Sequence, residues 1–195
     1  MRRVDVEPAS KLHTMDERLQ HLIDHAERVL TRLESVLPHA PRAPDWSASI
    51  AFRYRRRGAN AVLEPVRHAA TIRLTDLKEI DVQMERLRRN TEQFVGGRPA
   101  NNVLLTGARG TGKSSLIKAC LHEFAQRGLR LIEVDKADLI ELPDLVELVA
   151  GRPERFIVFC DDLSFDEGEP GYKALKSVLD GSVAATSENL SLIHI

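Results

Sequence analysis

A glycine-rich segment, GARGTGKSS, constrains the fold of this 195-residue chain more than any other stretch of its sequence. It has the spacing G-x-x-x-x-G-K-S, with Gly107, Gly112, Lys113 and Ser114 at the fixed positions. Glycines here let successive backbone N–H groups turn toward one concavity, where they bind anions. The segment follows an apolar run and precedes an amphipathic one. We therefore expect it to join a buried strand to a helix whose positive N-terminal end points into the same concavity.

The segment predicts a phosphate-binding loop that takes a nucleotide such as ATP. The loop amides hold phosphate, the Lys113 ammonium reaches the outer phosphates, and the Ser114 hydroxyl is a ligand for Mg²⁺. Arg109 either contacts phosphate or faces water, and the sequence favours neither. The expected nucleotide-binding residues are Gly107, Ala108, Arg109, Gly110, Thr111, Gly112, Lys113, Ser114 and Ser115.

Strand and helix patterns alternate along the second half of the chain. They are, in order, a helical stretch 75–97, a strand 102–107, a helix 112–128, a strand 129–135, a helical stretch 136–153 broken near Pro143, a strand 155–162 and a helix 171–181 closed by Gly181. Such alternation is typical of a parallel sheet flanked by helices. We expect an α/β fold of the P-loop NTPase type, preceded by a helical N-terminal segment.

Two adjacent aspartates follow the last predicted strand, whose residues 156–160 are apolar without alternation. That pattern is typical of a strand covered on both faces. Ligands of open α/β sheets bind beyond the carboxyl ends of the strands, so Asp161 is expected to hold Mg²⁺ opposite Ser114. Asp162 is expected to orient or deprotonate the attacking water. Mg²⁺ and Lys113 would then offset the repulsion between the carboxylates. The plainer alternative is that the pair only marks the exit of the strand into solvent.

The N-terminal region is expected to contain one amphipathic helix over residues 16–37, with Asp16 as its N-cap and Pro38 at its end. A proline-rich linker follows, and residues up to 70 have weak extended character. We expect an N-terminal region, 1–70, and a nucleotide-binding core, 71–189. The helix either mediates partner binding or self-association, or it packs on its own domain.

Two charged stretches have weaker interpretations. The basic stretch RYRRR, 53–57, with Tyr54 between its arginines, would contact nucleic acid through charge and stacking, although a solvated edge is the favoured interpretation. Asp166, Glu167 and Glu169 form an acidic cluster without a ligand pattern, and we expect a solvated loop there.

Composition argues against several classes of protein. A net charge of −1 gives no general attraction to nucleic acid or to an anionic membrane. Cys120 and Cys160 lie in apolar patterns and lack the spacing of a metal site or disulfide framework, so we expect small buried hydrophobes in a reducing compartment. No stretch has the roughly 18 apolar residues of a membrane span. These features predict a cytoplasmic protein without a membrane partner.

The phosphate loop and the acidic motif FCDDLSF, with their surroundings, resemble the AAA+ branch of P-loop ATPases. More narrowly, residues from about 70 to 189 look like a bacterial family of AAA-type ATPases. The resemblance implies ATP binding and hydrolysis, and an extra strand between the phosphate-loop strand and the acidic strand. It also implies that Leu77 and Ile80 lie near the adenine. Relatives act as homo-oligomeric rings that remodel a partner macromolecule, whose nature this sequence does not specify.

The chain departs from the AAA+ pattern in two places. Most AAA+ proteins have Asp-Glu where this chain has Asp161 and Asp162, so the water would have to lie closer to the shorter side chain. The family also continues after Asn189 with the central strand, a polar sensor residue, an arginine finger and a helical lid. Here the hexapeptide LSLIHI, 190–195, follows, and it equals the in-frame translation of a common transposase sequencing adapter.

We therefore expect the native sequence to end at Asn189 and residues 190–195 to be a non-native tail that is able to imitate a strand. A chain without the central strand would leave backbone groups of the two neighbouring strands unpaired. The expected consequence is a truncated, marginally stable ATPase that is deficient in catalysis.

Two other functions stay open at this point. A P-loop kinase acting on a small molecule would use the same loop, although the sequence marks no acceptor site. A nucleotide-dependent binding module without turnover would account for Asp162 and for the truncation.

Overall fold

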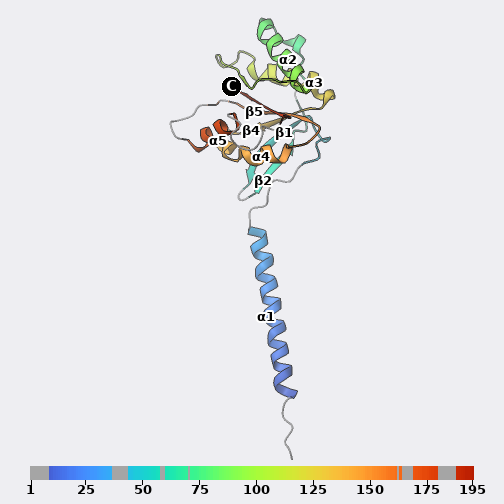
Figure 1. The fold of residues 1–195 in the computed structure, drawn as a ribbon, viewed down its shortest axis with the longest axis vertical. Helices are drawn as coiled ribbons and strands as arrows, with labels where there is room; N and C mark the ends of the chain where they lie inside the picture. The colour runs from blue at the N-terminus through green and yellow to red at the C-terminus, as the bar shows by residue number, and fades with distance from the viewer. Residues whose placement is uncertain are drawn as a thin grey trace, which may run out of the picture. The chain divides into compact units, whose positions relative to one another are not determined.

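The computed structural model describes residues 9–36, 44–57, 60–69, 71–161, 163, 169–179 and 188–195. The chain divides into two compact units, Met1–His39 and Ala40–Ile195. The elements are, in order, α1 (Ala9–Val36), β1 (Ala51–Arg57), β2 (Asn60–Pro65), η1 (Leu74–Asp76), α2 (Asp81–Val95), β3 (Val103–Leu104), α3 (Lys113–Phe124), η2 (Ala125–Arg127), β4 (Leu129–Val134), η3 (Lys136–Glu141), α4 (Leu142–Val149), β5 (Arg155–Cys160), α5 (Pro170–Leu179) and β6 (Leu190–His194) (Figure 1). The predicted α/β class is confirmed.

In the part of the N-terminal unit that the structure describes, residues 9–36 form one long helix, α1. It begins at Ala9, so the prediction of a start at Asp16 is wrong, and Asp16 lies inside the helix rather than at its N-cap. The reason is visible in the preceding residues, because Met15 lies one turn and Leu12 two turns before Leu19, and both continue the apolar spacing. Pro38, the predicted end of the helix, lies outside the described residues.

The second unit is built on one six-stranded sheet with the order β2-β1-β4-β5-β6-β3. Strands β1 and β2 form an antiparallel hairpin, and all other neighbouring strands pair in parallel. The hairpin falls in the stretch that we assigned to an N-terminal region ending at residue 70. It pairs with β4 through Phe52↔Ile132, however, so residues 51–65 belong to the sheet of the core.

Strand β6 occupies the position between β5 and β3 where the AAA+ resemblance implies an extra strand. Its residues are those of the hexapeptide that we expect to be non-native. Ile193 pairs with Phe159 of β5 on one side and with Val103 of β3 on the other. The backbone groups that would be unpaired without a central strand therefore have partners here.

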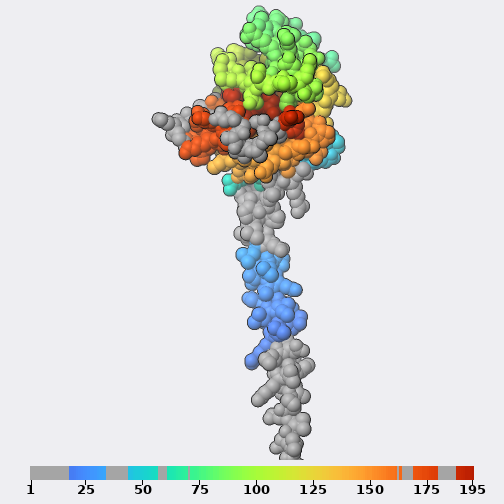
Figure 2. Space-filling model, in the orientation of Figure 1, coloured from blue at the N-terminus to red at the C-terminus, as the bar shows by residue number. Residues whose placement is uncertain are grey.

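Helices cover both faces of the sheet (Figure 1). On β5, Phe156, Val158 and Cys160 pack toward η3, α4 and α5, whereas Ile157 and Phe159 pack toward α2 and α3. This alternation explains the continuous apolar run in the sequence, because both sides of the strand are buried. In the space-filling view, β6 (dark red) lies between the green layer of α2 and the orange and red layer of α4 and α5 (Figure 2).

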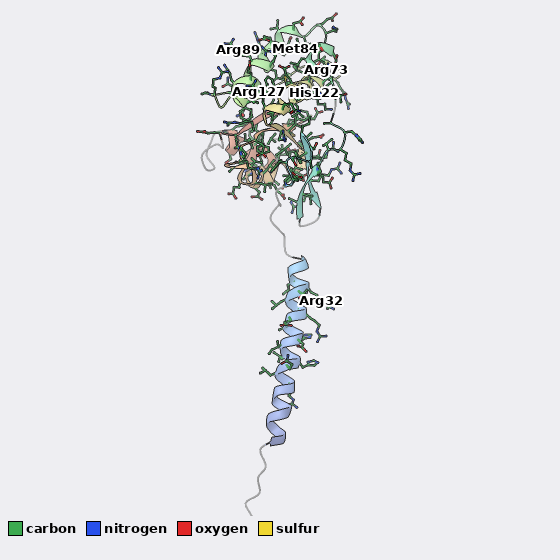
Figure 3. The ribbon with its side chains drawn as sticks, turned by 90° about the vertical axis from the view of Figure 1, so that its right-hand side faces the viewer. Arg32, Arg73, Met84, Arg89, His122 and Arg127 are labelled. Carbon is green, nitrogen blue, oxygen red and sulfur yellow. The ribbon has the colours of Figure 1, made fainter. Side chains whose placement is uncertain are left out.

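The predicted helices of the core are present with small shifts. The stretch 75–97 is split into η1 and α2, and α2 ends at Val95 with Gly96 as its C-cap. The break predicted near Pro143 falls between η3 and α4, where proline is tolerated in the first helical turn. Helix α2, with Met84 and Arg89, lies beside α3 and η2, with His122 and Arg127 (Figure 3). Gly181, the predicted end of the last helix, lies outside the described residues.

Candidate phosphate-binding site

The glycine-rich segment forms the loop between β3 and α3 at the carboxyl edge of the sheet. Gly107, Gly110 and Gly112 have φ values of +142°, +85° and +83°. Residues with a side chain rarely adopt such values, so the backbone conformation itself requires glycine at these positions. Gly112 is also the N-cap of α3, which places the N-terminal end of this helix at the loop.

Lys113, the first residue of α3, is folded back over the loop. Its Nζ atom donates hydrogen bonds to the carbonyl oxygens of Gly107, at 2.9 Å, and Ala108, at 2.8 Å. Thr111 Oγ1 donates to the same Ala108 oxygen at 2.9 Å. We expected Lys113 to be a positive partner of the acidic pair, but its ammonium is held by loop carbonyls. A cation held inside an amide-lined loop is a suitable partner for an anionic ligand.

Ser114 and Asp161 meet at the edge of this loop. Ser114 Oγ lies 3.3 Å from Asp161 Oδ2, although the two residues are 47 positions apart in the sequence. Asp161 follows β5 directly, and Ser114 is the second residue of α3. The proximity that we predicted from strand order is therefore present in the structure.

The two oxygens fit a small divalent cation. Mg²⁺ binds oxygen ligands octahedrally at about 2.0–2.1 Å, so neighbouring ligands lie roughly 3 Å apart, and it usually keeps several waters. A hydroxyl oxygen and a carboxylate oxygen at 3.3 Å match that separation closely. Asp161 is exposed and Ser114 is half-buried, which leaves room for waters on the solvent side.

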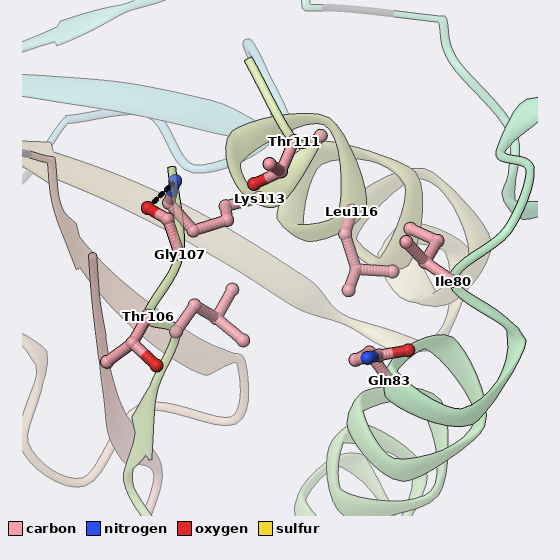
Figure 4. Close-up of a pocket in the computed structure, with 9 residues that line it drawn as sticks. Ile80, Gln83, Thr106, Gly107, Thr111, Lys113 and Leu116 are labelled. Atoms are coloured by element: carbon pink, nitrogen blue, oxygen red, sulfur yellow. Dashed lines mark hydrogen bonds between the residues drawn. The ribbon is translucent and has the colours of Figure 1, made fainter. Parts of the chain in front are cut away.

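A cavity of about 230 Å³ opens beside the loop (Figure 4). Its loop side is formed by Thr106, Gly107, Thr111, Gly112 and Lys113, and its other side by Ile80, Gln83, Leu105 and Leu116. The first group is polar, and the second is largely apolar with one amide side chain. The cavity therefore combines a polar surface with a largely apolar one.

From the AAA+ resemblance we expected Leu77 and Ile80 to lie near the adenine. Of these, Ile80 lines the cavity, at the N-cap of α2. Leu77 does not appear among the lining residues, and it packs half-buried against the core on the α2 and α3 face. The difference arises because η1 ends at Asp76 and the chain then turns before α2 begins.

Among the predicted site residues that the structure describes, Arg109 and Ser115 take no part in this geometry. Arg109 and Ala108 are exposed on the loop, and the Ala108 carbonyl rather than its side chain is used. Ser115 is half-buried on α3 and is not one of the residues that line the cavity. Asp162 lies outside the described residues, so its predicted role as the base stays a prediction.

Sequence reasoning missed Gln83, Thr106 and Leu116 as lining residues. Gln83 lies one turn beyond Ile80 along α2, so the helical period alone was the available signal. Thr106 precedes the first glycine of the loop. His194, the last residue of β6, pairs with Leu104 on one side and with Cys160 on the other. Its ring is half-buried, and burial lowers the pKa of His194 below its ordinary value.

Several side chains of the basic stretch in β1 are buried or form ion pairs within the fold. Tyr54 is buried, and its hydroxyl donates to Glu141 Oε2 at 2.6 Å. Burial and this hydrogen bond raise the pKa of Tyr54 above its usual value. Arg53 and Arg56 form ion pairs with Glu133 and Glu141. The suggestion that Tyr54 stacks on nucleic acid bases is therefore wrong, because its ring is not accessible.

Other candidate groups have structural roles as far as the described chain extends. Glu169, from the acidic cluster, pairs with Lys136 at 3.0 Å, and Asp166 and Glu167 lie outside the described residues. No group of three or more potential metal-ligating side chains occurs among the described residues. Burial raises the pKa of the Cys120 and Cys160 thiols to about 12, so both are protonated at neutral pH.

Residues 47–194, which make up most of the chain, match the model of a protein family described as "Protein of unknown function (DUF815)". The chain belongs to this family. The stretch that matches DUF815 contains the whole sheet, the glycine-rich loop and both Ser114 and Asp161, and α1 precedes it. A search of curated proteins finds no match to the chain. In the part of this DUF815 member that the structure describes, no helix has the length and apolar character needed to cross a bilayer.

Proposed function

We propose that this DUF815 protein binds ATP with Mg²⁺ and hydrolyses it in the manner of AAA+ ATPases. The contact between Ser114 Oγ and Asp161 Oδ2 carries the proposal. A glycine-rich turn with an incidental lysine would not require a carboxylate from another strand beside its serine. Strands β5 and β3 are separated by one strand position, as in the AAA+ strand order, and the hexapeptide expected to be non-native fills that position as β6.

In this proposal the residues of the loop divide the triphosphate between them. Backbone amides from Gly110 to Ser114 and the Lys113 ammonium would hold the phosphate oxygens. Ser114 and Asp161 would hold Mg²⁺, which supplies positive charge that neutralises the phosphates. Asp162, next in the sequence, would orient or deprotonate the attacking water.

The cavity beside the loop would receive the base. Ile80 and Leu116 offer apolar surface to the faces of an aromatic ring, and the Gln83 amide can both donate and accept hydrogen bonds. The ring would then lie against Ile80 and Leu116, and the triphosphate against the glycine-rich loop on the opposite side of the cavity. Lys113 would lie between the ring and the Mg²⁺ held by Ser114 and Asp161. Hydrolysis would serve to move or remodel a macromolecular partner.

A titration of the full chain with Mg²⁺-ATP in a calorimeter tests the binding. Lys113→Ala removes the ammonium, and we expect the dissociation constant to rise about tenfold to a hundredfold, since a hydrogen bond to a charged group contributes about 1.5–3 kcal/mol. Lys118→Ala is the matched control, because Lys118 is an exposed lysine on the same helix that does not line the cavity. Equal affinities of the wild-type chain and both variants would contradict the proposal.

Phosphate release, measured on the same preparations, tests hydrolysis. We expect slow Mg²⁺-dependent release, in keeping with the deficient catalysis expected from the sequence. Asp161→Asn should abolish it, because the amide keeps the shape of the carboxylate but loses its charge. Tight ATP binding without release would favour a nucleotide-dependent binding module. Transfer of the phosphoryl group to an added metabolite rather than to water would favour a small-molecule kinase.

A further inference from the structure

The α1 helix carries a continuous apolar surface on one side. Its large apolar side chains within residues 18–33 are between 42% and 68% exposed: Leu19, Leu22, Ile23, Val29, Leu30 and Leu33. They make up half of the exposed large hydrophobic residues of the described chain. A contiguous apolar surface of this kind usually marks an interaction site. We call it the α1 stripe.

The α1 stripe has a seven-residue repeat. Leu19, Ala26 and Leu33 form one row, Leu22 and Val29 form a second, and Ile23 and Leu30 form a third. In the sequence, Leu12, Met15 and Val36 continue the first two rows within the helical backbone of α1. A strict repeat of seven keeps the same side of a helix facing a partner helix in a left-handed supercoil.

The width of the α1 stripe indicates how many helices meet. Two apolar rows make the narrow seam of a two-stranded coiled coil, whereas a third row is typical of helices in a larger bundle. The row formed by Ile23 and Leu30 lies beside the row of Leu19, Ala26 and Leu33, so it widens the seam on one side. A pair of helices would leave this third row in water.

The charged residues on the two borders of the α1 stripe are complementary, so further copies of α1 are suitable partners. The same charges favour a parallel over an antiparallel orientation of the helices. Arg18, His25 and Arg32 follow one border at seven-residue spacing, and Figure 3 labels Arg32 among the α1 side chains. Gln20 and Glu27 follow the other border, and Glu34 continues it in the sequence. Parallel copies place the basic border of one helix against the acidic border of the next. Antiparallel copies would place like charges together.

We propose that copies of this chain associate through the α1 stripe into a parallel bundle of three or more helices. The parallel order brings the C-terminal ends of the helices together, so every copy leaves the bundle at the same end. The association does not require nucleotide, and it is tested separately from ATP binding.

Light scattering on the full chain, after size-exclusion chromatography, measures the association. One chain has a mass of 21.9 kDa, and we expect the wild-type chain to give at least three times that mass. The double variant Leu22→Gln with Leu30→Gln should give the mass of one chain, since glutamine keeps the helix propensity but removes apolar surface. The matched control, His21→Gln with Thr31→Gln, changes two positions away from the α1 stripe and should keep the wild-type mass.

A wild-type mass of one or two chains would overturn the proposal. So would an unchanged mass for the Leu22→Gln, Leu30→Gln variant, because the copies would then associate through another surface. Far-UV circular dichroism and the urea unfolding curve of each variant ensure that a change in mass reports the interface rather than misfolding.

Disulfide cross-linking tests the direction of the helices. In a parallel bundle Leu33→Cys places the new thiols at the same level, and mild oxidation should give linked pairs of chains on a non-reducing gel. In an antiparallel arrangement position 33 would face position 12, about 30 Å from the other thiol at 1.5 Å per residue. Thr31→Cys, outside the α1 stripe, is the control that should not link. Absence of linked pairs for Leu33→Cys would overturn the parallel order.

Discussion

Gly112 and Gly128 share a backbone conformation but differ in location. Gly112 has a φ of +83° at the start of α3, beside Lys113, and Gly128 has a φ of +89° after η2. A Cβ atom added at either position would meet nothing within 4 Å. The cost of a side chain there is therefore conformational, about 1–2 kcal/mol for a left-handed residue other than glycine. Comparing substitutions at Gly112 and Gly128 therefore distinguishes an effect on the stability of the fold from an effect on the function of the loop.

We predict that Gly112→Ala and Gly128→Ala each lower the free energy of unfolding by about 1 kcal/mol. Only Gly112→Ala should also weaken ATP binding, because relief of its strain would turn the amides at the start of α3 away from the ligand. Urea denaturation and calorimetric titration of both variants provide the two measurements. Equal loss of ATP affinity in both would mean that the loss comes from reduced stability rather than from the loop.

The sequence predicted the residues of the site whose positions depend on short-range geometry. Gly107, Gly112, Lys113 and Ser114 follow from one loop, and Asp161 follows from the rule that parallel strands end at the same edge. The residues on the largely apolar side of the cavity were harder to predict. Gln83, for example, reaches it only because α2 packs beside α3, and this long-range contact leaves no pattern in the local sequence.

Among the elements, β3 depends on its neighbour more than any other strand in the described sheet. It has two residues, and within that sheet it pairs only with β6. The loop follows β3 directly, and Leu105 donates its backbone N–H to the His194 oxygen at 2.9 Å. The position of the glycine-rich loop is thus set by β6. Packing of β6 should therefore affect both stability and ligand binding.

We predict that Leu192→Ala, in β6, lowers the free energy of unfolding by about 2–5 kcal/mol, the usual range for a buried leucine. Leu192 is 3% exposed. Leu104→Ala, in β3, is the matched control, since Leu104 is 59% exposed and its change should cost less than about 0.5 kcal/mol. Urea denaturation measures both. Similar losses in the two variants would mean that β6 is not packed in the centre of the sheet.

The helices and the parallel strands of the core were predictable because their patterns are local and strongly periodic. The hairpin was not assigned, although Phe52 and Tyr54 alternate with arginines as a half-buried strand requires. The run of arginines favoured an exposed stretch, and the Arg53–Glu133 and Arg56–Glu141 pairs that offset their charge come from distant segments. Pairing between β1 and β4 is likewise a long-range feature that no local pattern contains.

At the scale of the whole molecule, the two compact units have different sources of stability. Both core clusters lie within residues 46–193, inside the unit Ala40–Ile195. An isolated helix gains little stability from its own hydrogen bonds, so α1 needs packing partners to be stable. The second unit should therefore fold without the first, whereas α1 should depend on other copies of itself.

Removal of Met1–His39 tests whether the second unit folds on its own and whether association depends on α1. We expect the melting temperature of the remaining chain to change by less than about 3 °C, the shift that about 1 kcal/mol produces in a protein of this size. Saturating Mg²⁺-ATP should raise it as much as in the full chain, since ligand at a hundred times its dissociation constant adds about 2.7 kcal/mol. Light scattering should show a single chain, because the α1 stripe is gone. Differential scanning calorimetry with and without Mg²⁺-ATP gives both temperatures. A large fall in the melting temperature would mean that α1 packs on the second unit, and an unchanged oligomer would place the interface in the unit Ala40–Ile195.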